Sequence, residues 1–256
     1  MVVPVLLLAQ PHNPEAGRIQ VAGSQATMFI DAPRPLDSVT QTLAEYYGLL
    51  VNVEDPEYIY SEDVKDVTAE VARSPLPPGR RVLVPKGGKL EVPFAVDTGG
   101  APRDLRALLQ AAVDQANARF PFWYRVDDGA GFTLIPTKTR DAQGQVVDRP
   151  SLLDSKITLA ASTRHIYELG QALADALSAQ TGYHVSCCQS HVGGVPWGIQ
   201  VVAFEAHDES ARSVLVRLMS AAGGRTHYFQ RCDPVQAGLQ TGCAINVSAA
   251  PAFPPR

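Results

Sequence analysis

Apolar and polar residues follow the same order in the two halves of this chain. In the second half, residues 199–206 alternate as a strand does, residues 211–222 carry a helical stripe, and residues 226–232 and 243–247 indicate two further strands. Residues 90–136 repeat this order of strand, helix, strand and strand. Each stretch follows another strand–helix–strand segment. The pattern predicts an α+β fold of two tandem similar β-α-β-β-α-β-β units, each a mixed or antiparallel sheet with two helices on one face.

Four helices are expected, because apolar residues recur at positions i, i+3, i+4 and i+7. Proline is favoured in the first turn of a helix, and glycine or a short polar residue often marks its ends. The expected start and stop residues, in chain order, are Pro35 with Gly48, Pro102, Ser162 or Thr163 with Gly182, and Asp208 or Ser210 with Gly223.

Turn-forming stretches divide the chain between these elements. Within the first unit, alternation also predicts a strand at 64–72. The expected divisions are an apolar start and flexible lead-in at 1–26, a first unit at 27–137 with an insertion at 57–89, a linker at 138–155, a second unit at 156–248 and a proline-rich tail at 249–256.

The apolar stretch at 2–9 is too short to span a bilayer. It lacks the Lys or Arg that precedes a signal-peptide core, yet its composition and the small residue Ala9 are typical of the end of one. Two interpretations stay open, a truncated signal peptide and an N-terminal edge strand. The first, which we favour, predicts a secreted or periplasmic protein.

The composition of the chain limits the classes of partner that we expect. The 256 residues carry a formal charge of −4, so no basic field would attract nucleic acid or anionic lipid. No segment of the sequence is long and apolar enough to predict an integral membrane span. We therefore expect neither nucleic acid nor a membrane span.

Four cysteines stand at 187, 188, 232 and 243. Cys232 and Cys243 flank a loop between two predicted strands, where directly opposed residues come within reach of a disulfide. If the protein is exported, we expect this pair to be bridged. The alternative is two buried thiols, and the state of Cys187 and Cys188 stays open.

One cluster, His184-x-x-Cys187-Cys188-x-x-His191, contains metal-ligating residue types. Neighbours on a strand point to opposite faces, so these side chains diverge and no metal site is expected. No motif for a nucleophile, a cofactor or a phosphate loop is present, and we expect no catalytic or cofactor-binding residues. Two aromatic residues of predicted strands, Trp123 and Tyr228, are candidates for an outward-facing partner surface.

Residues 35–53, with the spacing Leu-x-x-Val-x-x-x-Leu-Ala-Glu-x-x-Gly, resemble the short N-terminal module of secretins and TonB-dependent receptors. Residues 169–185 and 211–224 resemble it more loosely. The chain is also similar to a group of exported acidobacterial proteins of unknown function, whose last strands pair around an Asp-Pro turn like Asp233-Pro234. In such modules the role is protein–protein contact in the cell envelope, in ring building or signal relay.

The expected function is therefore that of a non-enzymatic, exported cell-envelope module with an unidentified protein partner. Two alternatives stay open, and both use the cleft between the units. One is a small-ligand binder. The other is a hydrolase whose site is assembled from scattered residues such as His165, His227, Asp208 and Glu209.

Overall fold

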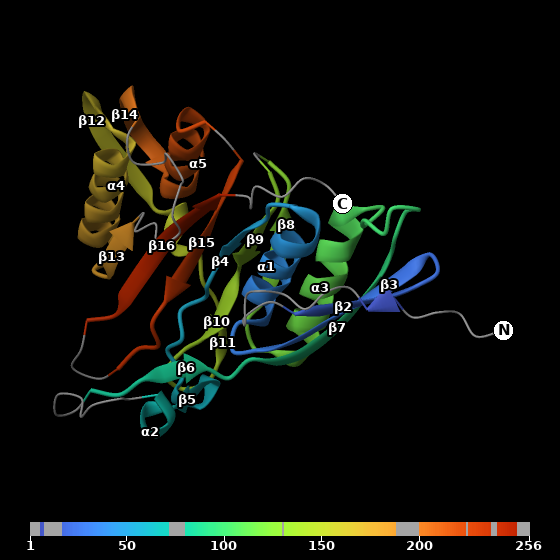
Figure 1. Ribbon diagram of the computed structural model, residues 1–256. Coiled ribbons are helices and arrows are strands. Elements are labelled where there is room, and N and C mark those ends of the chain that lie inside the picture. Colours follow the sequence, from blue (N-terminus) through green and yellow to red (C-terminus); the bar gives the residue numbers. More distant parts are fainter. Residues whose placement is uncertain are drawn as a thin grey trace.

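The computed structural model describes residues 6–7, 17–71, 80–129, 131–187, 200–223, 225–236 and 240–249. Within these ranges the protein is a mixed α+β structure with five α-helices and several sheets (Figure 1). The first half contains β1 (Leu6–Leu7), β2 (Arg18–Ala22), β3 (Gln25–Ala32), α1 (Pro35–Tyr47), β4 (Asn52–Glu54), η1 (Ser61–Asp63), β5 (Val64–Asp66), α2 (Thr68–Val71), β6 (Leu83–Pro85), β7 (Gly88–Ala95), α3 (Leu105–Arg119), β8 (Tyr124–Asp127) and β9 (Thr133–Pro136). There follow β10 (Lys138–Arg140), β11 (Val146–Asp148), η2 (Leu152–Asp154), β12 (Lys156–His165), α4 (Ile166–Thr181), β13 (His184–Cys187), β14 (Val201–Ser210), α5 (Ala211–Ala221), β15 (Thr226–Cys232) and β16 (Gly242–Ala249).

A six-stranded sheet runs through both halves of the chain in the order β13-β16-β15-β4-β9-β8. Its junction is the parallel pair of β15 and β4, where Phe229 lies opposite Val53. β4 is also parallel to β9, and β13 is parallel to β16. The two halves therefore share one sheet rather than each closing a sheet of its own.

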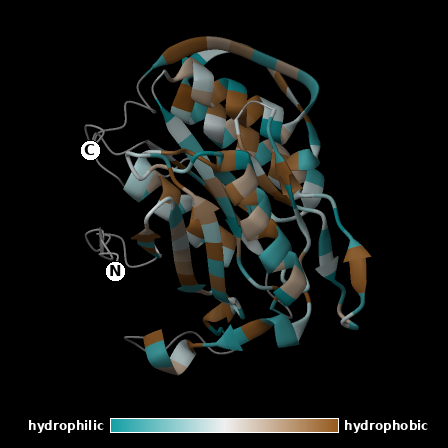
Figure 2. Ribbon diagram, turned by 90° about the vertical axis from the view of Figure 1, so that its right-hand side faces the viewer, coloured by the Kyte–Doolittle hydropathy of each residue, from teal (hydrophilic) through white to brown (hydrophobic). Residues whose placement is uncertain are grey.

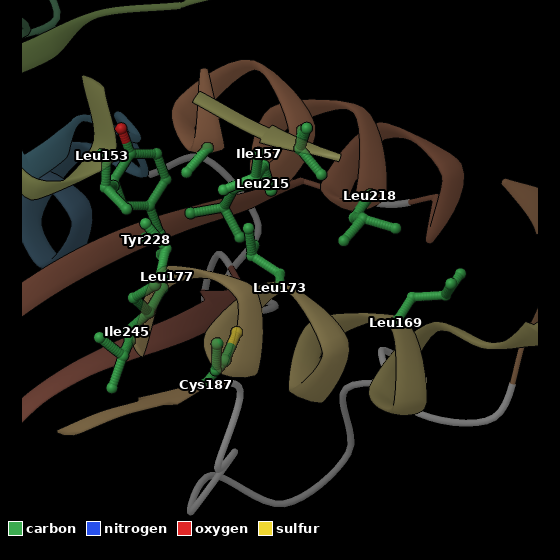
Figure 3. Close-up of a cluster of buried hydrophobic side chains, with 14 of the residues drawn as sticks. Leu153, Ile157, Leu169, Leu173, Leu177, Cys187, Leu215, Leu218, Tyr228 and Ile245 are labelled. Atoms are coloured by element: carbon green, nitrogen blue, oxygen red, sulfur yellow. The ribbon is translucent and has the colours of Figure 1, made fainter. Parts of the chain in front are cut away.

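The two helix pairs cover opposite faces of this shared sheet. Tyr228 packs in the core formed with α4 and α5, whereas its neighbour Phe229 packs against the core formed with α1 and α3. Successive side chains of a strand point to opposite faces, so β15 is covered on both sides. Figure 2 shows apolar and polar bands alternating along the helices. Figure 3 shows leucines of α4 and α5 facing one another in one core, with Tyr228 and Ile245 at one end of it.

A second, four-stranded sheet of the first half has the order β1-β2-β3-β7. β3 and β7 pair antiparallel from Gln25 opposite Ala95 to Ala32 opposite Gly88, and β2 pairs antiparallel along the other edge of β3. Residues 18–22 are therefore a strand, and the expected flexible lead-in is wrong there. Leu6 and Leu7 pair with β2, which fits the edge-strand interpretation of the N-terminus; the rest of 1–16 lies outside the described residues.

In the second half, β12 and β14 form a two-stranded antiparallel ribbon. Its register runs from Lys156 opposite Ser210 to His165 opposite Val201, with two irregularities between them. Among the described residues, no third strand joins this ribbon.

Most helix ends agree with the sequence. α1 begins at Pro35 and stops at Gly48, whose φ of 63° suits glycine, and α4 stops at Gly182 with a φ of 77°. Ser210 caps α5 by accepting a hydrogen bond from the amide of Ser213. The expected cap at Ser162 or Thr163 is wrong, because β12 continues to His165 and α4 starts only at Ile166.

Two connecting segments differ from expectation. The strand predicted at 64–72 ends after three residues, because the carboxylate of Asp66 accepts from the amide of Thr68 and the short helix α2 begins there. The segment predicted as a linker at 138–155 contains the β10–β11 hairpin and the single turn η2. None of the described helices has the length and apolar character needed to cross a membrane.

Candidate functional site

Three parallel strands, β15, β4 and β9, end at the same edge of the shared sheet. In open α/β sheets this edge, where the loops after the strands meet, is the usual place for a ligand. Buried charged residues gather here, from the end of β4, the first turn of α1 and the neighbouring strand β15. This cluster is our candidate site.

The carboxylate of Glu54, at the end of β4, is fully buried and receives donors from the second half of the chain. Arg212 on α5 donates from Nε to Oε1 at 2.6 Å and from Nη2 to Oε2 at 2.7 Å. The hydroxyl of Tyr228 donates to Oε1 at 2.7 Å, and that of Ser151 donates to Oε2. Arg212 also donates to Asp154 at 2.6 Å. Because every charge in this group has a partner, burial of Glu54 is compensated.

The next residue, Asp55, belongs to a second network on the opposite side of β4. Arg34 donates from Nε to Oδ2 of Asp55 at 2.5 Å and from Nη2 to the carbonyl of Cys232 at 2.9 Å. The hydroxyl of Tyr58 donates to Oδ1 at 3.2 Å. Burial raises the pKa of Asp55, and the charge of Arg34 opposes that rise.

A third ion pair joins α1 to β15. Asp37, buried in the first turn of α1, accepts from Nε of Arg231 at 2.7 Å and lies 2.6 Å from its Nη2. A carboxylate in the first turn also suits the positive end of the helix dipole. Arg212 and Arg231 therefore both reach from the second half of the chain to carboxylates of the first half.

His227, on β15 near Asp37, is buried, and its Nδ1 has no hydrogen-bond partner among the described residues. Burial lowers the pKa of His227 to about 4, although the charge of Asp37 acts in the opposite direction. The folded protein therefore keeps this imidazole neutral over a range in which an unfolded chain would protonate it.

Acid is accordingly expected to destabilise the protein through His227. The unfolded chain takes up a proton near pH 6.5 and the folded chain only near pH 4, so stability falls as the pH drops through this window. At pH 5 the loss from this residue is about 2 kcal/mol.

Urea unfolding of the native protein and of His227→Gln at pH 7, 6 and 5 measures this loss. As the pH falls, His227→Gln is expected to lose less stability than the native protein. His184→Gln, at an exposed strand position, is the matched control. If the free energy of unfolding fell equally with pH in the native protein and in His227→Gln, His227 would not be the source of the acid sensitivity.

Two depressions border the cluster. The first, with about 310 Å³ of empty space including open solvent, is lined by Glu57, Arg149, Tyr183 and the half-cystines 232 and 243. The second, of about 410 Å³ on the same measure, is lined by residues that include Arg34, Asp37, Tyr58, Lys86 and Tyr124.

The ionisable groups that line the two depressions are mostly buried or paired with each other. Burial, with Asp55 adding to it, raises the pKa of both Tyr58 and Tyr124 well above the usual value, so these phenols stay neutral. Among the described lining residues there is no histidine that could activate a nucleophile. The arrangement can bind and orient polar groups, and its buried ion pairs join the two halves.

No family model, curated protein or solved structure matches this chain. The resemblance to secretin and receptor modules therefore stays a prediction, and the remaining evidence is the geometry of the chain itself.

The predicted bridge between Cys232 and Cys243 is confirmed. The two residues lie directly opposite each other on β15 and β16, with an S–S distance of 2.02 Å. Cys187 is disulfide-bonded as well, so its sulfur is not available as a metal ligand. Cys188 and His191 lie outside the described residues. In the part of the chain that the structure describes, no three metal-ligating side chains gather.

The two aromatic candidates for a partner surface have different positions. Trp123 is 48% exposed, with the ammonium of Lys138 4.5 Å from its ring centroid. Tyr228 is fully buried, and its assignment to an exposed surface is wrong. β15 lies between β16 and β4 with helices on both faces, so neither of its faces is open.

The scattered residues proposed for a hydrolase do not converge. His165 lies at one end of the β12–β14 ribbon, and Asp208 and Glu209 lie at the other. His227 is buried on β15. Sequence reasoning missed Glu54 and its arginine partner, although the alternation of residues 51–54 does place Asn52 and Glu54 on one face of a predicted strand.

Proposed function

We propose that this chain is a tandem of two similar β-α-β-β-α-β-β units and acts as a non-enzymatic protein–protein interaction module of the cell envelope. In this proposal it works as the short N-terminal modules of secretins and TonB-dependent receptors do, by presenting a rigid surface to a protein partner.

A shared scheme of strand pairing supports the tandem arrangement. In each half the first strand pairs antiparallel with the third, as β3 with β7 and β12 with β14. The second strand runs parallel to the fifth, as β4 to β9 and β13 to β16. The fourth and fifth strands form a hairpin in both halves. A duplicated unit that keeps its topology has this pattern of non-local pairs.

The observation that supports the functional proposal is the way in which the buried carboxylates are paired with arginines. Glu54 and Asp37 are each paired with an arginine from the other half of the chain, and Asp55 is paired with Arg34. Catalytic sites instead contain charged groups that are available to a substrate. Here these groups hold the two units in one fixed relation, which is what a scaffold requires.

The cysteines support the proposed compartment. The bridge between Cys232 and Cys243 is consistent with an oxidising environment, in which such bonds persist. We therefore propose that the protein is secreted or periplasmic.

Several large apolar side chains lie at the surface where a partner could bury them. Trp123, in the first half, is 48% exposed. In the second half, Tyr167 in the first turn of α4 is 46% exposed, and Val201, opposite His165 in the ribbon, is 54% exposed. Aromatic residues are enriched at the centre of protein interfaces.

In-cell photo-crosslinking of the full chain in its native host tests the proposal. A benzophenone amino acid is placed at Trp123, Tyr167 or Val201, and at Gln110 on the exposed face of α3 as control. We expect a discrete adduct of higher mass from at least one of the first three positions and none from Gln110. Fractionation with thiol alkylation in the same cells should find Cys232 and Cys243 oxidised and the protein outside the cytoplasm. Absence of adducts at all positions, or alkylation of both thiols in untreated cells, would contradict the proposal.

A further inference from the structure

The two halves differ at one strand edge. In the first half, β3 has β7 on one side and β2 on the other. In the second half, β12 has β14 on one side, and no described strand lies on its other side. Figure 1 shows β12 at the outer rim of the molecule. The edge that β2 covers in the first half therefore has no described counterpart in the second.

The hydrogen bonds at both ends of the ribbon show which backbone groups point outward. The amide of Ile166 donates to the carbonyl of Gln200, and the carbonyl of Ser155 accepts from Ala211, both at 2.9 Å. In an antiparallel pair, successive residues direct their backbone groups alternately toward and away from the partner. Thr163 near one end and Lys156 and Thr158 near the other therefore direct their N–H and C=O groups to the open side.

The side chains of this edge do not block pairing. Natural edge strands are usually blocked by a charged residue, a proline, a β-bulge or a covering segment. The two irregularities of the ribbon lie between Ile157 and Ser162, so an incoming strand would pair with the regular stretches on either side of them. Residues 157–163 contain neither a charge nor a proline, and the exposed side chains at 158, 160, 161 and 163 are Thr, Ala, Ala and Thr. Small and β-branched side chains leave room for an incoming strand.

Charge identifies the kind of strand that fits. Lys156 and Arg164, at the two ends of this segment, are exposed and form no ion pair with a described residue. A second copy pairing antiparallel through β12 would bring Lys156 of one chain near Arg164 of the other, and like charges across a strand pair are unfavourable. An extended segment with acidic ends would instead complement both.

We infer that β12 is a strand-acceptor site that binds an extended, acidic-flanked segment of a partner protein as an antiparallel third strand, in the position that β2 has in the first half. This inference rests on the proposed interaction function and assigns it a surface. Backbone hydrogen bonds supply the affinity in this mode of recognition, and the flanking charges supply the preference.

A pair of synthetic peptides tests the site on the full, oxidised chain. The first is a Val-Thr repeat with two Glu at each end, and the second has Lys in place of Glu. Fluorescence anisotropy measures binding, and hydrogen exchange locates it. We expect the acidic peptide to bind at least about tenfold more tightly than the basic one and to slow exchange at the amides of Lys156, Thr158 and Thr163.

Thr163→Pro removes one outward N–H while leaving the bonds to β14 in place, and should weaken the acidic peptide about tenfold. Thr27→Pro, in β3 where β2 already covers the edge, cannot serve as control because it breaks a native ladder. Thr98→Pro is used instead, at an exposed turn position whose N–H donates to no described backbone group. Equal binding of the two peptides, unchanged binding by Thr163→Pro, or dimerisation of the free chain through β12 would overturn the inference. Crosslinks elsewhere on the surface, with no peptide binding at β12, would leave the proposed interaction function standing and remove only this site.

Discussion

Replacing Arg212 with methionine is expected to lower the free energy of unfolding by about 3–5 kcal/mol at pH 7. Methionine fills similar volume but leaves the carboxylate of Glu54 buried at 0% exposure without its cation. Tyr228 and Ser151 continue to donate to that carboxylate, but two neutral hydroxyls do not replace a bidentate guanidinium. Urea unfolding measures the loss.

The matched control is Arg106→Met. Arg106 pairs with Asp128 on the surface, where both side chains are more than half exposed, so its loss is expected to cost at most about 1 kcal/mol. Combining Arg212→Met with Glu54→Gln should recover part of the stability, because the neutral amide no longer needs a cation and still accepts from Tyr228. A cost for Arg212→Met as small as that of Arg106→Met would show that the buried pair does not hold the two halves together.

Removing the bridge between Cys232 and Cys243 is expected to lower the free energy of unfolding by about 3 kcal/mol. The bond joins residues 11 positions apart, and its loss restores conformational freedom to the unfolded chain. The double variant Cys232→Ala/Cys243→Ala isolates this effect, whereas a reductant would also open the bond at Cys187. Urea unfolding under non-reducing conditions is the measurement.

The expected change is in the midpoint of unfolding together with a steeper dependence on urea, because the unfolded chain without the bridge exposes more surface. Val247→Ala, which removes side-chain volume from a buried position of the same hairpin, controls for the loss of packing. If the double variant unfolds within about 0.5 kcal/mol of the native protein, the bridge is not a stabilising element of the hairpin.

Local patterns predicted local structure well. The proline at 35, the glycines at 48 and 182 and the serine at 210 act within one helical turn, so their effect does not depend on distant contacts. The disulfide was accessible to the same reasoning, because a hairpin sets its two cysteines opposite each other.

The shared sheet was not predictable in this way. Alternation along a strand shows which side chains share a face, but not which strand lies beside it. Only two residue pairs, at Val53 and Glu54, join β4 to β15, and more than half of the chain separates them in sequence. Tyr228 was therefore assigned to an open face that the other half of the chain in fact covers.

The cluster of buried charged residues could not be predicted from the sequence for a related reason. Glu54 and Asp55 have the composition of a strand end followed by a turn, and Asp55 does precede a proline. Only the non-local arrival of Arg212 makes it possible to bury Glu54. Similarly, the ion pair of Arg231 with Asp37 joins β15 to α1, two elements that the sequence does not place side by side.

The junction of β4 with β15 also affects how the protein is made. A ribosome must add residues 55 to 225 after β4 has emerged before the neighbouring strand exists. At about 5–20 residues per second this interval is on the order of ten seconds or more. During it the nascent first half presents an unfinished strand edge, a form prone to wrong association. Newly synthesised chains are therefore expected to need protection of this edge until β15 is translated.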